Sequence, residues 1–149
     1  MRRASCRLAA LVVGIVLAAC EAKEKGAAVG ETVMLPPNVR AMIRSAMVDG
    51  IEPAFTLLWR RAYQDDLRQV PDAALALRVS AQSIRTELEQ SQGVPPDMLA
   101  LFDRMGAQAD SIAAAAGSDD LPRTLTLIDR LRRGTCDGCH TRFHVHTGT

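Results

Sequence analysis

Residues 121–140, LPRTLTLIDRLRRGTCDGCH, join an amphipathic helix to a group of chemically distinctive side chains. Apolar residues recur in the first part of this stretch at the spacing of one helix face, and they are Leu121, Leu125, Ile128 and Leu131. Two cysteines and a histidine follow near its end. The apolar stripe predicts a helix that packs against other helices, and the residues after it give that helix a chemical role.

The motif CDGCH at residues 136–140 predicts the covalent attachment of a haem. Its two thiols lie one helical turn apart, so each can add across a haem vinyl group, and the imidazole of His140 can bind the iron as its proximal ligand. The same residues also suit a redox dithiol or, together with His144 and His146, a zinc site. Both of these alternatives describe a protein without haem.

Residues 1–19 have the form of an export signal. Three arginines precede an apolar run at residues 8–19, which is too short to cross a bilayer comfortably as a permanent helix. The sequence LAAC at residues 17–20 resembles the lipobox of bacterial lipoproteins, which implies that Cys20 is the lipidated first residue of the mature chain. An ordinary signal peptide would instead leave Cys20 as a spare thiol. Residues 20–37 are small, charged and rich in Gly and Ala, and they predict a flexible tether.

Each of the four cysteines has an expected role or fate. Cys6 leaves with the signal and Cys20 takes the lipid, so Cys136 and Cys139 remain as a pair. Covalent haem attachment takes place on the far side of the bacterial cytoplasmic membrane, and an export signal agrees with that location. We therefore expect a periplasmic protein anchored by lipid to the inner or the outer membrane.

Composition, charge and the absence of catalytic motifs argue against several classes of function. Aromatic residues are only 3% of the 149-residue chain, which favours packed helices over a β-sandwich. Without residues 1–19 the chain has 15 basic residues against 17 acidic ones, a balance that argues against a nucleic-acid binder. No Ser-His-Asp set, nucleotide-binding glycine loop or convincing pair of carboxylates is visible, so we do not expect an enzyme.

The folded domain is expected to span residues 38–149 and to begin with Asn38 as a helix cap. Gly50 and Pro53 interrupt the helical spacing, because proline cannot donate a backbone hydrogen bond and crowds the preceding turn. We predict one long helix with a kink or short break near residues 49–53, or failing that two helices. The apolar stripe before the interruption consists of Val39, Met42, Ile43, Ala46 and Met47.

Three further helices are predicted after the first. The second begins with PD at residues 71–72 and closes at Gly93, and the third begins with PPD at residues 95–97 and ends before Gly117. Residues 118–120 offer caps for the fourth. The predicted inward residues of the second and third helices are Ala74, Leu77, Ala81, Ile84, Leu88, Met98, Leu101, Phe102, Met105, Ala109 and Ile112. Short connections predict antiparallel neighbours, and the expected fold is an all-α, antiparallel four-helix bundle with a C-terminal CxxCH motif.

A four-helix bundle with this motif near its C-terminus resembles the cytochrome c′ and cytochrome c556 family, the class II c-type cytochromes. By helix number and order the resemblance covers residues 38–146. Its specific part is CDGCHTRF at residues 136–143, which is similar to the family's ending in having an aromatic residue three positions after the histidine. The rest of the chain matches by architecture.

The resemblance implies a role for each residue of the motif. Cys136 and Cys139 would form the thioethers to one haem c, and His140 would be the fifth iron ligand. The family usually has an Arg or Lys four residues after that histidine, where this chain has His144. Details of how the family tunes the iron from this side therefore do not carry over.

The sixth iron position distinguishes two functions within the family. The resemblance implies that the first helix supplies this position. An apolar side chain there leaves the iron five-coordinate and open to nitric oxide or carbon monoxide, whereas a methionine completes the shell and suits electron transfer. Met47 is the predicted sixth ligand and Met42 the second candidate, with open coordination and a core role for both methionines as the alternative. The expected function is electron transfer to a periplasmic redox partner, and the resemblance also implies a homodimer through the first two helices.

Overall fold

The computed structural model describes residues 33–143. Within this range the chain is helical apart from short connections and contains no strand, so the predicted all-α class is confirmed. The predicted signal peptide, Cys20 and residues 20–32 of the predicted tether lie outside the described residues, as do His144 and His146. In the described part of the tether, residues 33–37, Leu35 is buried at 4% exposure.

The helices in chain order are α1 (Pro37–Ala46), α2 (Glu52–Tyr63), α3 (Val70–Glu89), α4 (Pro96–Gly117), α5 (Leu121–Leu131) and α6 (Asp137–Phe143). A π turn, Met47–Ile51, joins α1 to α2, and a second π turn, Arg132–Cys136, joins α5 to α6. A short 3-10 helix, Leu67–Gln69, precedes α3. The six helices therefore make four rods, of which the first and the last are composite.

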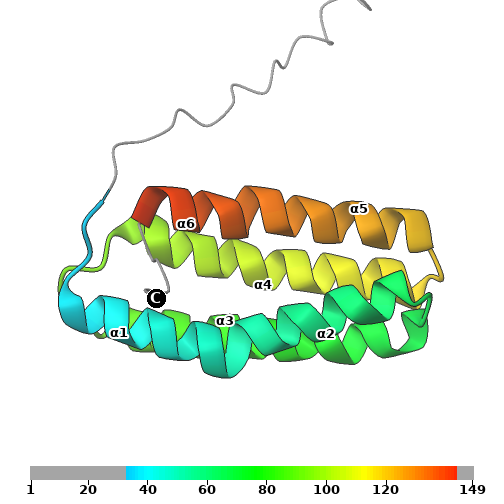
Figure 1. Cartoon of the computed structure of the whole chain (residues 1–149), viewed down its shortest axis with the longest axis horizontal. Coiled ribbons are helices and arrows are strands. Elements are labelled where there is room, and N and C mark those ends of the chain that lie inside the picture. The colour runs from blue at the N-terminus through cyan, green and yellow to red at the C-terminus, as the bar shows by residue number, and fades with distance from the viewer. Residues whose placement is uncertain (1–32, 144–149) are drawn as a thin grey trace, which may run out of the picture. The chain divides into compact units, whose positions relative to one another are not determined.

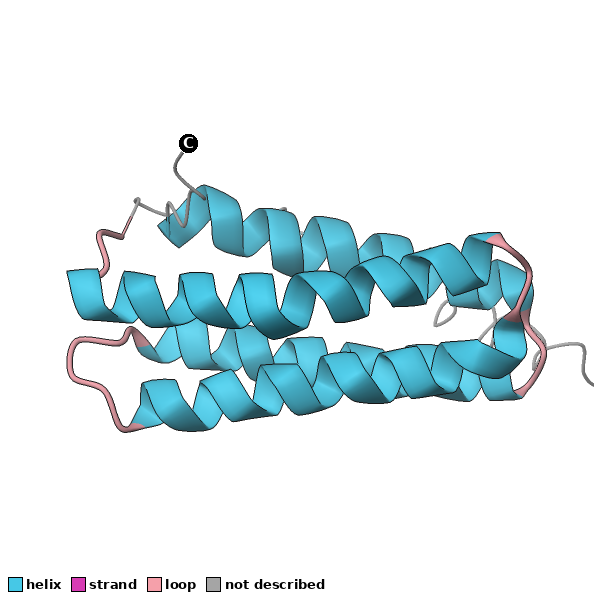
Figure 2. Cartoon of the chain, turned by 60° about the horizontal axis from the view of Figure 1, so that its bottom comes forward, coloured by secondary structure: helices cyan, strands magenta, loops and turns pink. Residues whose placement is uncertain are grey.

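The four rods lie side by side, and their connections lie at the two ends (Figures 1 and 2). The rod formed by α3 packs along α4, which also packs against α5. The composite first rod closes the arrangement because α2 contacts both α3 and α5. The described residues thus share one helical core.

The predicted apolar stripes form most of this core, with departures in the first rod and in α5. In the first rod Met42, Ala46 and Met47 are only partly buried. The fully buried large side chains of α1 to α4 include Val39, Ile43, Leu58, Leu77, Ile84, Leu88, Met98 and Ile112. In α5 the predicted Leu121 and Leu125 are only partly buried, and Thr124 is fully buried beside them. The Thr124 hydroxyl donates to the carbonyl of Asp120 at 2.8 Å, so a polar group is accommodated in the core without an unpaired hydroxyl.

Some predicted helix ends were right and others wrong. Asn38 is not a cap, because α1 begins at Pro37 and Pro36 precedes it without a side-chain hydrogen bond. Asp120 does cap α5, since its carboxylate accepts from the Arg123 N–H at 3.0 Å. Gly117 is the last residue of α4 and does not lie beyond it. Proline in the first turn fixes these starts more than capping side chains do.

The break predicted near residues 49–53 is the first π turn. The N–H of Glu52 bonds to the carbonyl of Met47, five residues back. In an α-helix Pro53 would face the carbonyl of Asp49, to which it has no N–H to donate and against which its ring would press. A wider turn relieves this contact while the rod continues.

The second π turn has no proline and was not predicted. The N–H of Asp137 bonds to the carbonyl of Arg132, again five residues back. A side-chain contact spans the same five residues, because Arg132 lies 3.4 Å from the carboxylate of Asp137. Residues five apart point in different directions in an α-helix, about 140° from each other, so this contact depends on the extra residue of the π turn.

Both π turns keep the core face of a rod continuous. Buried residues stand eight positions apart across each turn, Ile43 and Ile51 in the first rod and Leu131 and Cys139 in the last. In a regular α-helix that spacing separates two side chains by about 80°, whereas the extra residue of a π turn brings them closer to one direction. The π turns therefore narrow the buried stripe of each rod. The eight-residue step alone does not indicate a π turn, because Ala73 and Ala81 of the regular helix α3 are both buried at this spacing.

The backbone conformation of Gly93 leads to a prediction about the connection between α3 and α4. Its φ is +78°, and a Cβ there would lie 2.9 Å from Cγ of Pro36. The variant Gly93→Ala should lower the free energy of unfolding by about 1–2 kcal/mol from the left-handed conformation alone, and the contact adds to that loss. Urea unfolding of the parent and the variant measures the difference.

The matched control is Gly117→Ala at the end of α4. No atom lies within 4 Å of a Cβ built at Gly117, and its φ is not in the left-handed region. This substitution should leave stability within about 1 kcal/mol of the parent. Equal losses for the two variants would contradict the assigned role of Gly93.

Candidate functional site

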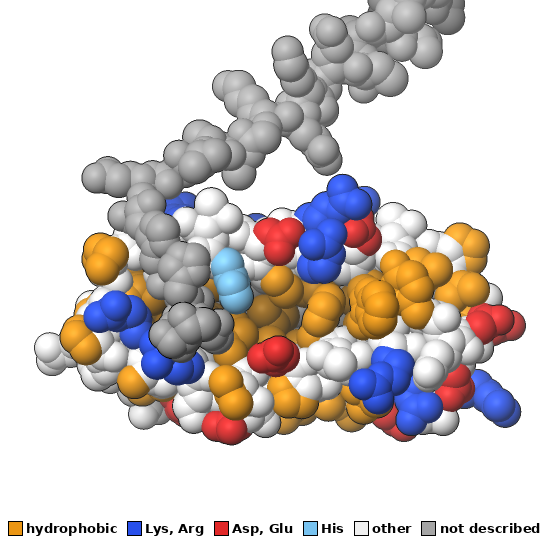
Figure 3. Space-filling model, in the orientation of Figure 1, with side chains coloured by type: hydrophobic (Ala, Val, Ile, Leu, Met, Phe, Trp, Pro, Cys, Tyr) orange, Lys and Arg blue, Asp and Glu red, His pale blue; other side chains and the backbone are white. Residues whose placement is uncertain are grey.

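One cavity of about 290 Å³ lies between the first rod, α4 and the end of the last rod. Its apolar walls are formed by Met47, Ile51, Phe55, Leu101, Phe102 and Met105. Both cysteines of the motif and His140 also line it. Figure 3 shows hydrophobic surface in a hollow beside the pale blue histidine. The cavity is therefore apolar inside and has thiol and imidazole groups on one wall.

The motif residues come from the second π turn and from α6. Cys136 is the last residue of the π turn and is half-buried, Cys139 is buried at 3% exposure, and His140 is exposed. The structure thus brings the predicted Cys136, Cys139 and His140 to one cavity together with Met47, the first residue of the other π turn.

Met42 does not line this cavity. It borders a separate groove between the first rod and α3, and its sulfur accepts a hydrogen bond from the Ser91 hydroxyl at 3.9 Å. Met42 and Met47 are five residues apart, which places them about 140° from each other around an α-helix. Of the two methionines considered for the sixth position, the structure brings only Met47 to the motif.

Burial suppresses the acidity of the thiols. Desolvation raises the pKa of Cys136 to about 11, and the negative charge of Asp137 adds to this shift. The pKa of Cys139 is also raised to about 11, first by burial and then by its neighbour Cys136. Redox dithiols rely on a lowered thiol pKa, so these surroundings do not favour the dithiol interpretation.

The described residues contain no cluster of three or more His, Cys, Asp or Glu side chains placed to hold a metal ion. The zinc interpretation relied on His144 and His146, which lie outside the part of the chain that the structure describes. That interpretation therefore has no support from the described residues.

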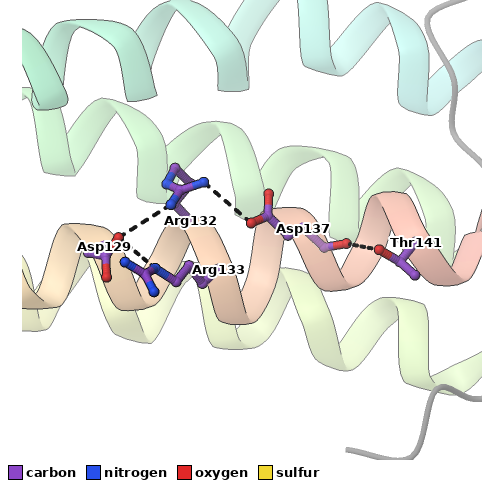
Figure 4. A network of polar contacts seen from close by, with 5 residues as sticks. All are labelled: Asp129, Arg132, Arg133, Asp137 and Thr141. Atoms are coloured by element: carbon purple, nitrogen blue, oxygen red, sulfur yellow. Dashed lines mark hydrogen bonds and ion pairs between the residues drawn. The ribbon is translucent and has the colours of Figure 1, made fainter.

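Ion pairs surround the outer face of the motif. Arg132 bridges two carboxylates, with 3.4 Å to Asp129 and 3.4 Å to Asp137, and Arg133 contacts Asp129 at 2.9 Å (Figure 4). The hydrogen bond from Arg133 is the main cause of a lowered Asp129 pKa. The Thr141 hydroxyl donates to the carbonyl of Asp137 at 2.7 Å. All of these groups are largely exposed, so each pair contributes little stability but limits where the side chains lie.

The end of α6 is held by contacts to two other segments. Arg142 forms an ion pair with Asp97 in the first turn of α4. The carbonyl of Arg142 accepts from the N–H of Val33 at 2.9 Å, and Phe143 is buried at 1% exposure. The helix that carries the motif is therefore anchored beyond the motif as well as before it.

Sequence reasoning missed two charged residues and the identity of the cavity walls. Arg44 and Glu52 line the cavity and are otherwise exposed. The only signal for them was their position within one or two turns of Met47. Leu101, Phe102 and Met105 were predicted to point inward, but helical spacing does not distinguish a cavity wall from a filled core.

The residues present fit a flat, mostly apolar cofactor with a polar edge. Six apolar side chains offer contact to its faces, two thiols could form covalent bonds to it, and His140 could bind a central metal. Arg44 supplies a positive charge on the same cavity, where it would suit carboxylates at the edge of such a group.

Comparisons with protein-family models, with curated proteins and with solved structures found no match to this chain. Among the described residues, no helix has the length and apolar character needed to span a membrane.

The raised thiol pKa values predict a distinctive alkylation profile for the haem-free protein. Because the pKa of each thiol is about 11 in place of 9.0, the thiolate fraction at pH 8 should be about 100-fold smaller than in the denatured chain. The pH profile of the iodoacetamide labelling rate should therefore have its midpoint near pH 11 in the folded protein and near pH 9 in the denatured chain. Coincident profiles would contradict the assigned burial.

The raised thiol pKa values also make the stability of the haem-free protein depend on pH. A raised pKa means that the folded haem-free chain binds these protons more tightly than the unfolded chain. The corresponding stability is fully present below pH 9 and is lost as the pH rises towards about 11.

Proposed function

We propose that the chain is a c-type haem protein, an antiparallel four-helix bundle that carries one haem covalently on Cys136 and Cys139 with His140 as proximal iron ligand. The observation that carries this proposal is the apolar cavity that both thiols, the imidazole and Met47 line together. When bound, the haem would supply a one-electron redox centre and a site for a sixth ligand.

The chain's own residues would have three tasks at this site. The apolar walls would exclude water from the faces of the ring, and Phe55 and Phe102 offer the largest contact areas among them. Arg44 would balance the charge of a haem propionate. Asp137 and Thr141 lie on the outer face of the motif helix, where they support its position without entering the cavity.

We assign electron transfer as the function, with Met47 as sixth ligand. Its support is the position of Met47 on the same cavity as His140, while Met42 contacts Ser91 elsewhere. A second candidate function is the binding of nitric oxide or carbon monoxide at five-coordinate iron. Ile51 supports this alternative, because it also lines the cavity from the first rod and could cover the iron without binding it.

The cellular setting of the proposal rests on sequence patterns outside the described residues. Cys20 would carry the lipid that holds the domain at a periplasmic membrane surface, and a periplasmic redox protein would be the partner. The proposed homodimer through the first two rods has support in their exposed apolar side chains, which are Val48, Leu57, Trp59, Tyr63, Leu75 and Val79.

Haem attachment can be tested by mass spectrometry of the denatured protein. After expression with a c-type maturation system, the parent should carry one haem that survives acid–acetone extraction. The double variant Cys136→Ala, Cys139→Ala should carry none, because no thioether can form. Met42→Ala serves as the matched control and should retain the full haem mass. Absence of added mass in the parent would disprove the proposal.

The sixth ligand can be tested by absorption spectra of the haem-loaded protein. Met47→Ala should convert a low-spin spectrum to a high-spin one, since a strong-field ligand is lost, and Met42→Ala should leave the spectrum unchanged. A parent that is already high-spin, is unaffected by Met47→Ala and shifts on exposure to nitric oxide would support gas binding in place of electron transfer.

A further inference from the structure

Two threonines are fully buried in the described part of the chain, and they use their hydroxyls differently. Thr124 bonds to Asp120 of its own rod at 2.8 Å. Thr135 bonds to a different helix, since its hydroxyl donates to the side-chain carbonyl of Gln108 in α4 at 2.7 Å. A buried bond between helices fixes both partners, whereas a bond within one helix fixes neither relative to the bundle.

Thr135 occupies a sensitive position in the last rod. It lies in the second π turn, immediately before Cys136, and it lines the cavity. Without the extra residue of this turn, the segment after it would be rotated by about 100° relative to the core. Cys139 and Phe143, both buried at 3% or less, would then change direction relative to the other buried side chains. The rotation of the motif therefore has to be fixed by contacts to other helices.

The ion pairs of this segment are exposed. Arg132 and Asp137 are about half-exposed, as are Arg142 and Asp97. Such pairs contribute little, because water competes for both charges. In the hydrogen bond between Thr135 and Gln108, the threonine hydroxyl is buried. Loss of the partner of a buried hydroxyl lowers the stability of the fold more than loss of the partner of an exposed one. Among the polar contacts of the segment, this bond is the one best suited to fix its rotation.

We propose that Thr135 and Gln108 are positioning residues, whose hydrogen bond sets the rotation of the attachment motif so that Cys136, Cys139 and His140 face the cavity. The proposal rests on the proposed function in one respect, because the group that the motif is positioned for is haem. The positioning itself is a property of the haem-free chain and can be measured without haem.

The first experiment measures thiol protection in the folded, haem-free protein. Brief N-ethylmaleimide treatment followed by peptide mass spectrometry gives the labelling rates of Cys136 and Cys139 separately. In the parent, half-buried Cys136 should react faster than buried Cys139. The isosteric variant Thr135→Val should raise the Cys139 rate by about tenfold, because the segment is then free to rotate. Thr135→Ser, which keeps the hydroxyl, should restore the parent rate.

Two further variants keep this experiment decisive. Gln108→Leu removes the acceptor from the opposite helix and should raise the Cys139 rate as Thr135→Val does. Thr124→Val is the matched control, an equally buried threonine whose partner is in its own rod. It should lower the urea midpoint but leave the labelling ratio of the two cysteines unchanged. Equal loss of protection in Thr124→Val and Thr135→Val would show a merely structural role and overturn the proposal.

The second experiment uses the haem-loaded protein and its spectrum. Thr135→Val and Gln108→Leu should broaden or shift the bands that report iron ligation, while the threonine-to-serine variant and Thr124→Val should match the parent. Unchanged spectra together with unchanged Cys139 protection would overturn the positioning role. If the parent carries no haem but Thr135→Val still exposes Cys139, the proposed function fails and the positioning role stands.

Discussion

The structure depends on keeping one core face along rods whose buried residues are eight positions apart. In a regular α-helix such residues lie about 80° apart, so the buried stripe is broad. The first and last rods narrow this stripe in the same way, with a π turn between Ile43 and Ile51 and another between Leu131 and Cys139. Each turn adds one residue to the circumference, so the buried stripe resumes on the same side of the rod.

The two π turns also shape the cavity. Four residues of the two turns line the cavity. They are Met47 and Ile51, the first and last residues of one turn, and Thr135 and Cys136, the last two residues of the other. π turns widen the helix and are often found at functional sites. Apolar walls facing water are unfavourable, so a flat apolar group bound there would stabilise the fold.

Much of the architecture could be predicted from the sequence, but the cavity could not. Proline positions and apolar spacing gave the helices, and Pro53 gave the location of the first π turn. The second turn has no proline, and the eight-residue step from Leu131 to Cys139 does not predict it. Buried residues at that spacing also occur in a regular helix, as Ala73 and Ala81 do in α3.

Some residues of the candidate site could be predicted from the sequence, and others could not. The motif at residues 136–140 was visible because its residue types are rare at that spacing. Met42 and Met47 could have been separated from spacing alone, since five residues of helix turn them about 140° apart and both cannot face one cavity. Phe55 and Phe102 could not be recognised as cavity walls, because burial by a core and burial by a cofactor leave the same apolar pattern.

The charges around the motif limit how a partner could recognise this end of the molecule. Three of the arginines near the motif, Arg132, Arg133 and Arg142, each contact a carboxylate. Strong electrostatic steering needs an excess of one sign, and paired charges of opposite sign largely cancel at a distance.

An apolar surface leads away from the cavity instead. Phe55 lines the cavity wall, and Trp59 and Tyr63 follow at steps of four residues along α2. The rings of Trp59 and Tyr63 stack with centroids 4.5 Å apart, and the two side chains are 45% and 59% exposed. Four-residue steps keep neighbouring side chains on one helix face, so this aromatic pair follows the cavity wall along α2. A molecule that approaches this face of α2 meets exposed aromatic rings, and contact there would depend on apolar burial more than on charge.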